Sequence, residues 1–385
     1  MSLVSSCSSQ RRDDSWGKTP EEIKKLRKKE FKKLKREKGE IKGEFTFFIE
    51  SNGSFQLKQT KKYNLVKAII NSTQSIDCFI YKDQKLVSKH IWELTNKFID
   101  GSKKYEFLKS RSGIFDSDPY LSLQTQFLDP KGEIKLLKVI SVRNAQRQIT
   151  CINQDMGYIK SFRRVVADFI ASINDGKNKR NKFEQVSFIS QGKNRFGYER
   201  DTLSKLVGGG DLLKNTTHSI VISSPTEIQA IDEIVLQSID KNFKFKELYL
   251  EGYVNGDRIK QVMVQPDGQG TYSVNVELDG KGVEGTYPLK NMTSNLIFEK
   301  SVYDKLTKDK KYSELTFWPT HDYIRPMQTN FAFQKWVKGK KYITVKFGKS
   351  SEIWRFDGEG KVDLKVVKKN GQRHVIKRAY QFGSL

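Results

Sequence analysis

The chain has 385 residues, of which 36% are hydrophobic, and its formal net charge is +25. This length suits two domains, or one large β domain with an insertion. An aromatic content of 11% excludes a disordered chain and indicates a real core. The apolar runs are far shorter than the ~20 residues of a membrane-spanning helix, so no transmembrane segment is expected. No catalytic signature occurs either, and we expect a protein that is not an enzyme.

The excess of basic residues favours a polyanionic partner, either nucleic acid or an anionic membrane surface. Between Arg11 and Lys42 there are fourteen Lys/Arg and seven Asp/Glu, so this segment carries +7 of the total. The remaining +18 is spread over a much larger body, where a coding bias toward lysine is an equally good explanation. The charge therefore indicates one basic segment on a moderately basic body.

Residues 1–18 are small, polar and mixed in charge, and we expect them to be disordered. The sequence around Cys7 is similar to the cleavage box of a bacterial lipoprotein, in which the cysteine is lipidated. Only six residues precede Cys7, too few for the positive and apolar regions of such a signal. Either the true start lies upstream of Met1, or a serine-rich tail matches the box by chance, and the chance match is the preferred interpretation.

A helix is predicted to begin after Thr19, a good N-cap that is followed by a proline and two glutamates. The helical composition continues to Lys38, and Gly39 is the expected stop. The basic side chains either lie on a polyanion or form the solvated face of a helix that docks on the body. Those expected to face nucleic acid are Lys24, Lys25, Arg27, Lys28, Lys29, Lys32, Lys33, Lys35 and Arg36.

From Ile41 the sequence becomes typical of β-structure. A first hairpin is expected around Asn52 and Gly53, joining residues 44–49 to residues 54–57. From Phe243 onward, alternating runs separated by Asn-Gly and Asp-Gly turns predict a meander of hairpins. Other strands are expected over Ser75–Tyr81, Tyr120–Leu128, Glu133–Val142, Gln148–Ile152 and Phe183–Ile189.

Helices are predicted to interrupt these strands. Tyr158–Ile173 has one apolar face, and Val87–Ile99 is a second helical segment. A capping box at Ser224–Glu227 predicts a helix near 225–240. A domain boundary is expected between residues 176 and 216. The predicted parts are a flexible tail and basic helical arm over 1–40, a β-rich domain over 41–205 and a second β-rich domain over 206–385.

The three cysteines form no Cys-x-x-Cys pair, which argues against a zinc ribbon or a disulfide-rich scaffold. Cys78 and Cys151 lie in strand-like runs, and we expect them to be reduced, buried thiols. The four histidines are far apart in the sequence, so neither a metal site nor a cofactor is expected.

Basic and aromatic residues alternate in one further segment. Arg195 and Arg200 are candidates for holding phosphates while Phe196 and Tyr198 stack on bases, a combination used for single-stranded nucleic acid. An ordinary loop is the alternative interpretation.

The basic arm and the β runs from Phe45 onward resemble viral capsid proteins, in which such an arm faces the genome and jelly-roll strands form the shell. At this length the chain looks like a penton or minor capsid protein of a small double-stranded DNA virus of the virophage type. The resemblance implies a mainly β, jelly-roll-like β-sandwich with an additional β domain. It also implies a homo-oligomer with five-fold assembly, other capsid subunits as partners, non-specific contact with nucleic acid and a place in the virion.

Two alternatives remain open. A surface lipoprotein would use Cys7 as its anchor and the lysine-rich helix as a membrane-proximal spacer. A basic nucleic-acid-binding protein would use the arm and the segment Arg195–Arg200, and its affinity would fall steeply with salt.

Overall fold

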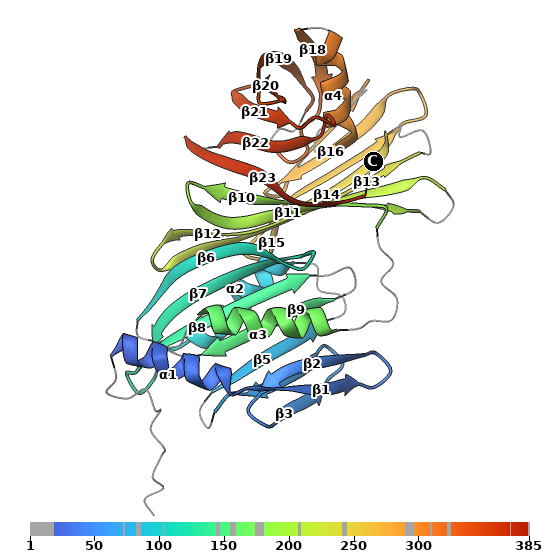
Figure 1. Cartoon of the computed structure of the whole chain (residues 1–385). Coiled ribbons are helices and arrows are strands. Elements are labelled where there is room, and N and C mark those ends of the chain that lie inside the picture. Colours follow the sequence, from blue (N-terminus) through green and yellow to red (C-terminus); the bar gives the residue numbers. More distant parts are fainter. Residues whose placement is uncertain are drawn as a thin grey trace, which may run out of the picture.

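The computed structural model contains three antiparallel sheets and, among the residues it describes, four short helices (Figure 1). This confirms the expected mainly β fold class with a few short helices. The described residues are 19–71, 74–81, 86–102, 104–143, 147–154, 159–173, 181–206, 209–240, 245–288, 296–308, 310–321, 325–369 and 371–383.

A seven-stranded sheet, called here the middle sheet, lies at the centre of the molecule (Figure 1). Its strand order is β3-β4-β5-β9-β8-β7-β6. Strands β3–β5 therefore form one meander and β6–β9 form a second, and the two meet where β5 lies next to β9. The strands are β3 (Phe55–Gln59), β4 (Asn64–Ile69), β5 (Ser75–Tyr81), β6 (Tyr105–Phe115), β7 (Asp118–Leu128), β8 (Ile134–Arg143) and β9 (Gln148–Gln154).

One face of the middle sheet is covered by a hairpin and two helices. These are β1 (Lys35–Ile41) with β2 (Phe45–Ser51), α1 (Pro20–Lys32) and α3 (Ile159–Ser172). Phe47 of β2 meets Phe169 of α3 edge to face at 5.5 Å. Phe31 of α1 is buried in the same apolar core. The basic helix is thus docked on the body by its apolar side.

A fourteen-stranded sheet, called here the large sheet, forms the other end of the molecule (Figure 1). Its order is β17-β16-β15-β14-β13-β12-β11-β10-β23-β22-β21-β20-β19-β18. The strands are β10 (Phe183–Gln191), β11 (Asn194–Lys205), β12 (Asp211–Ser224), β13 (Glu227–Ile239), β14 (Phe245–Val254), β15 (Asp257–Pro266), β16 (Tyr272–Leu278), β17 (Lys281–Tyr287), β18 (Lys311–Thr316), β19 (Met327–Val337), β20 (Lys340–Phe347), β21 (Ser350–Phe356), β22 (Val362–Lys369) and β23 (Gln372–Phe382).

The large sheet curves back on itself, and one short segment holds its two halves together. Phe317 packs with apolar residues of β13–β16, whereas the next residue, Trp318, packs in the core formed by β19–β22 and α4 (Leu296–Lys308). Trp318 stacks on Phe347 with ring centroids 3.7 Å apart. Lys260 of β15 also donates a hydrogen bond to the carbonyl oxygen of His321.

Helix α2 (Val87–Ile99) lies between the middle and large sheets and packs on both. Its N-cap residue, Leu86, provides no side-chain cap. Instead Asp232 of β13 accepts hydrogen bonds from the backbone N–H groups of Ser88 and Lys89, each at 2.9 Å. His218 Nδ1 lies 2.6 Å from the same carboxylate, and both side chains are fully buried. Asp232 therefore joins the large sheet to the helix N-terminus, where a negative charge is stabilising.

Several sequence predictions are confirmed. Helices α2 and α3 occupy the segments expected for them, and Ser75–Tyr81 is a strand with the predicted bounds. The other expected strands fall within β7, β8, β9 and β10, except that Glu133 lies one residue before β8. Thr19 and Glu22 form a capping box at the start of α1.

The prediction that α1 continues to Lys38 is wrong. The helix ends at Lys32, and Lys35 and Arg36 begin β1, which pairs with β2. The ring of Phe47 lies where a Cβ of Gly39 would be, so Gly39 makes room for this ring rather than stopping a helix. The hairpin expected around Asn52 is also wrong, because β2 pairs with β1 and β3 pairs with β4.

The helix predicted near 225–240 is wrong as well. Residues 225 and 226 form a turn, and Glu227–Ile239 is a strand that pairs with β12 and β14. Ile228, Ala230 and Asp232 are buried at alternate positions, the period of a strand. The β-branched isoleucines favour this outcome, and their helical spacing is coincidental.

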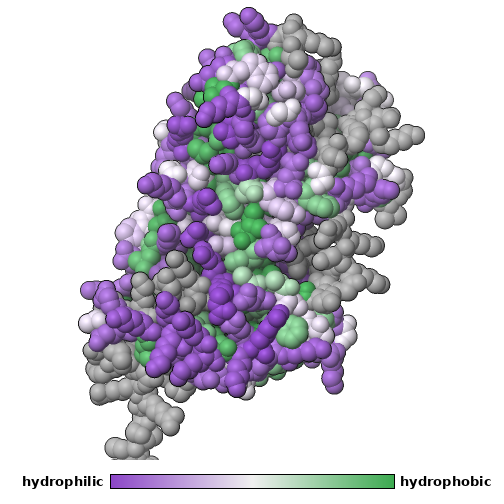
Figure 2. Space-filling model, in the orientation of Figure 1, coloured by the Kyte–Doolittle hydropathy of each residue, from purple (hydrophilic) through white to green (hydrophobic). Residues whose placement is uncertain are grey.

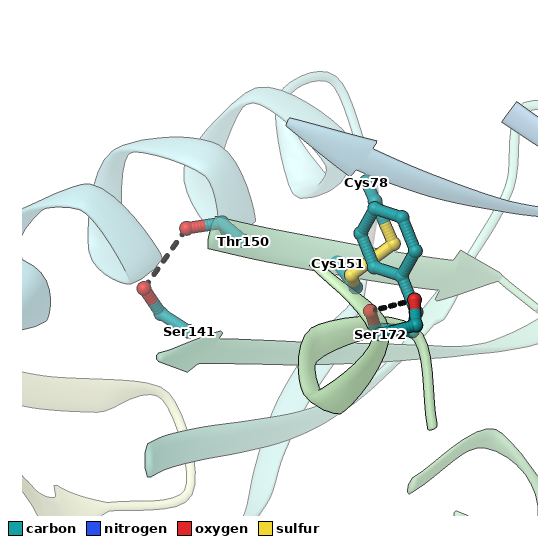
Figure 3. The surroundings of a disulfide bond; sticks show 6 residues. Cys78, Ser141, Thr150, Cys151 and Ser172 are labelled. Atoms are coloured by element: carbon teal, nitrogen blue, oxygen red, sulfur yellow. Dashed lines mark hydrogen bonds between the residues drawn. A yellow bond between two sulfur atoms is a disulfide. The ribbon is translucent and has the colours of Figure 1, made fainter. Parts of the chain in front are cut away.

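Cys78 and Cys151 form a disulfide, which corrects the expectation of two reduced thiols (Figure 3). The two residues are directly opposite each other on β5 and β9, with Cα atoms 4.0 Å apart. Both are completely buried in the core that also contains α3. Cys7 lies outside the described residues.

The strands of the large sheet follow sequence order on either side of one junction, where β10 pairs with β23. They therefore connect as two meanders, whereas a jelly roll uses Greek-key connections. The chain passes from the middle sheet to the large sheet between β9 and β10. Strands β10 and β11, which the boundary at residue 205 assigned to the first domain, thus belong to the large sheet.

Candidate functional site

A cavity of about 720 Å³ lies between β10–β13 and β21–β23, inside the curve of the large sheet. This volume falls in the range of small-molecule binding sites. Residues of α4 and of the segment around Trp318 complete the lining. The cavity therefore exists because one sheet supplies two facing walls.

The first wall presents a row of polar side chains across neighbouring strands. Ser187 lies opposite Glu199, Glu199 opposite Thr217, and Thr217 opposite Glu233. All four line the cavity because side chains alternate between the faces of a strand. Since Thr217 lies between the two glutamates, their backbones are two strand spacings, about 10 Å, apart.

A parallel row lies next to it. Gln185 is opposite Asp201, which is opposite Asn215, and these three side chains are buried. Asn215 Nδ2 donates a hydrogen bond of 2.8 Å to Asp201 Oδ1. Burial raises the pKa of Asp201 to about 6, although the hydrogen bond from Asn215 opposes this.

The second wall contains ion pairs. Lys365 Nζ of β22 lies 2.5 Å from Glu299 Oε1 of α4. Burial alone would lower the pKa of Lys365, but the charges of Glu299, Glu199 and Glu352 raise it. Lys365 therefore stays protonated and neutralises part of the acidic lining.

Both carboxylate oxygens of Glu352, on the same wall, also have partners. Its Oε1 lies 3.2 Å from His321 Nε2, and its Oε2 accepts a hydrogen bond of 2.6 Å from Trp354 Nε1. Burial would raise the pKa of Glu352, but the hydrogen bond from His321 and the nearby positive charges outweigh it. The net shift is downward, so Glu352 is an ionised, structural carboxylate.

The charge balance of the lining is the reverse of that of the whole chain. Six carboxyl groups line the cavity, against four lysine and arginine side chains. Two of those four, Lys349 and Lys368, are exposed and mark the rim. The interior is therefore acidic although the protein is strongly basic.

Two acceptors in the cavity are candidates for binding a ligand. Gln185 Oε1 is buried without a hydrogen-bond partner among the described residues, and the side chain of Glu199 is half-buried in the cavity lining. Burial raises the pKa of Glu199 to about 8, and the nearby charges of Asp201, Glu233 and Glu299 add to the effect of burial. Lys365 opposes the shift. Both acceptors lie on neighbouring strands and face the same space.

The residues of the predicted basic arm are in two elements and are not a free arm. Lys25, Lys28, Lys29, Lys32 and Lys33 are exposed on α1 and at its C-cap, and Lys35 and Arg36 are exposed on β1. Arg36 lies over the ring of Phe48 at 4.3 Å. The side chains of Lys24 and Arg27 lie outside the described ones.

The segment Arg195–Arg200 is part of β11. Phe196 and Tyr198 are buried, so the prediction that they stack on bases is wrong. Arg200 lies 2.8 Å from Glu184 and donates a hydrogen bond of 2.7 Å to the carbonyl oxygen of Arg143. Arg195 is exposed and lies over the ring of Phe188. The alternation in the sequence reflects the two faces of a strand.

Sequence reasoning missed the cavity residues altogether. A signal was present, because Gln185, Ser187, Glu199 and Asp201 place polar side chains at alternate positions of two strands, on the face turned toward the cavity. Such alternation normally indicates a solvent-facing surface. Only the curvature of the sheet turns that surface into a cavity.

Within the described ranges, no three His, Cys, Asp or Glu side chains are placed to hold a metal ion. In the same ranges, no helix is long and apolar enough to cross a membrane.

No protein-family model and no curated protein matches the sequence. Among solved structures, the chain is similar to a β-barrel-like protein of domain of unknown function DUF1849 from Brucella abortus, with 10% identity and a TM-score of 0.42, over 52% of this chain and 97% of that one. A DUF1089 family protein from Pseudomonas aeruginosa has 11% identity and a TM-score of 0.28, over 44% and 89% of the two chains. PsbP from Synechocystis sp. PCC 6803 has 13% identity and a TM-score of 0.26, over 37% and 92%. None of these three is described as a capsid protein, and at these values the similarities carry no argument about function.

Proposed function

We propose that the protein is a binding protein whose large sheet holds a small, positively charged organic molecule, such as an amine or a guanidine. The observation that carries this proposal is the unpartnered, buried Gln185 Oε1 beside the carboxyl group of Glu199, in a cavity of about 720 Å³. A buried polar group without a partner costs free energy, so such groups mark places where a ligand completes the hydrogen bonding.

The chemistry of the two acceptors selects the ligand. An ionised carboxylate only accepts hydrogen bonds, and an amide oxygen does the same, so the ligand has to bring N–H or O–H donors. A cation is favoured over a neutral donor because carboxyl groups outnumber lysines and arginines in the lining. Trp318 and Trp354, which also line the cavity, offer apolar surface to the carbon skeleton of the ligand.

Binding of a cation should be coupled to release of a proton. The raised pKa of Glu199, about 8, means that the empty cavity holds this group mostly protonated at pH 7. A bound cation favours the ionised form, so the proton leaves as the ligand enters. Affinity is then expected to increase as the pH rises toward 8.

The test is a thermal-shift and calorimetric comparison of putrescine and agmatine with the uncharged 1,4-butanediol and the anionic succinate. We expect the two cations to raise Tm and the other two compounds to leave it unchanged. Glu199→Gln should lose at least tenfold in affinity for the cations, because an amide cannot neutralise them. Glu284→Gln is the matched control, since Glu284 is an exposed glutamate on β17 away from the cavity lining. Equal responses to putrescine and succinate, or equal losses in the two variants, would contradict the proposal.

Assembly into a virus capsid, with a pentameric ring and contact with a genome, stays a prediction from the sequence resemblance. Light scattering of the purified protein tests it, because a monomer at high concentration would count against it. A binding protein is proposed instead because the cavity supports that function.

A further inference from the structure

We propose that the exposed lysines of α1 form a docking surface for an anionic membrane surface. This inference is independent of the cavity in the large sheet, because α1 lies at the opposite end of the molecule (Figure 1). It rests on the way the helix is fixed, on the unpaired state of its cations and on the buried disulfide.

Helix α1 presents its charges in a fixed array. Phe31 is 5% exposed and Leu34 is partly buried in the core beneath α1, so the helix cannot rotate or insert its apolar side elsewhere. Lys25, Lys28 and Lys32 recur at the spacing of one helix face, which is the face turned to solvent. Figure 2 shows hydrophilic side chains gathered over this end of the molecule. The surface can therefore adsorb to a charged layer but not enter it.

The acidic residues across the hollow beside α1 pair with Arg164 rather than with these lysines. A hollow of about 320 Å³ beside α1 is lined by Lys28 and Lys32, together with Glu50 and Arg164. Arg164 donates two hydrogen bonds to Glu50, at 2.5 and 2.6 Å, and lies 3.2 Å from Asp168. Lys28 and Lys32 have no acidic partner among the described residues. Their positive charge is thus available to phosphate groups.

The disulfide indicates which of two polyanions, nucleic acid or an anionic membrane surface, is the partner of this surface. The Cys78–Cys151 bond is completely buried, and disulfides of this kind form and persist in oxidising compartments rather than in the cytosol. In an oxidising compartment the abundant extended anion is the headgroup layer of a membrane, whereas nucleic acid is chiefly in reducing ones. We therefore favour anionic lipid headgroups as the partner.

The experiment measures co-sedimentation of the full-length protein with vesicles of phosphatidylcholine alone and with vesicles that contain phosphatidylglycerol. One variant replaces Lys25, Lys28, Lys29, Lys32 and Lys33 by glutamine. Its matched control replaces five lysines that are exposed on the large sheet, Lys246, Lys281, Lys311, Lys346 and Lys377, so both variants lose the same charge.

We expect binding to phosphatidylglycerol vesicles only, a decrease of about 100-fold or more in the α1 variant, and a much smaller decrease in the control. Binding should also be released by high salt. The proposal is overturned if the vesicles are not bound, if both variants weaken equally, or if duplex DNA is bound through the α1 lysines more tightly than the vesicles are. The last result would restore the nucleic-acid interpretation of this segment.

Discussion

The disulfide between Cys78 and Cys151 allows a quantitative prediction about stability. Reducing it opens a closed loop in the unfolded chain. The two cysteines are 73 residues apart, and closing a loop of this length is worth about 4 kcal/mol of unfolding free energy in the chain-entropy model. With a urea m-value of about 3 kcal/mol/M, the midpoint of unfolding should fall by about 1.3 M on reduction.

The assay is urea unfolding of a Cys7→Ser variant, with and without reductant, followed by tryptophan fluorescence. Thiol titration in denaturant should give no free thiol before reduction and two after it. A variant with Cys78→Ala and Cys151→Ala is the control, and its midpoint should not respond to reductant. Two free thiols in protein secreted to an oxidising compartment, or an unchanged midpoint on reduction, would refute this reasoning.

Three further variants test other contacts. Glu199→Gln should be more stable than the parent at pH 8 and similar to it at pH 5. The reason is that a carboxyl whose pKa rises to about 8 on folding makes stability fall as pH rises from about 4.5 to 8. Chemical denaturation at both pH values checks this prediction, and a gain in stability at pH 5 alone would contradict it. Asp232→Ala should lower the free energy of unfolding by about 3–5 kcal/mol, since it leaves two backbone amides of α2 and the buried His218 without their acceptor. A loss below 1 kcal/mol in urea unfolding would show that this helix cap is dispensable. Arg200→Gln should lower Tm by removing the ion-pair partner of Glu184, with no change in the salt dependence of DNA binding. A weaker salt dependence with unchanged Tm would favour the nucleic-acid role instead.

The sequence predicted elements whose determinants are local. The apolar face of α3 and the alternation of Ser75–Tyr81 are set by neighbouring residues, and both elements lie where they were expected. Lys35 and Arg36 were assigned to a helix because their composition allows it. Pairing of β1 with the strongly β-forming β2 overrides that propensity.

The candidate site depends on contacts that no local pattern contains. Asp232 caps a helix 144 residues away in the sequence, and the disulfide closes a separation of 73 residues. Glu199 and Glu233 face one cavity only because of the register of three strands and the curvature of the sheet. The sequence showed the polar residues but not the wall that faces them.

The pairing of β10 with β23 has a consequence for synthesis of the chain. Ser190 donates a hydrogen bond to the carbonyl oxygen of Val375, 185 residues later. At about 5–20 residues per second, one edge of β10 waits on the order of 10–40 s for its partner. An unpaired strand edge is a template for aggregation, so the nascent chain should need protection at β10 until β23 is made. Inserting a translational pause before β22 should therefore lower the yield of soluble protein.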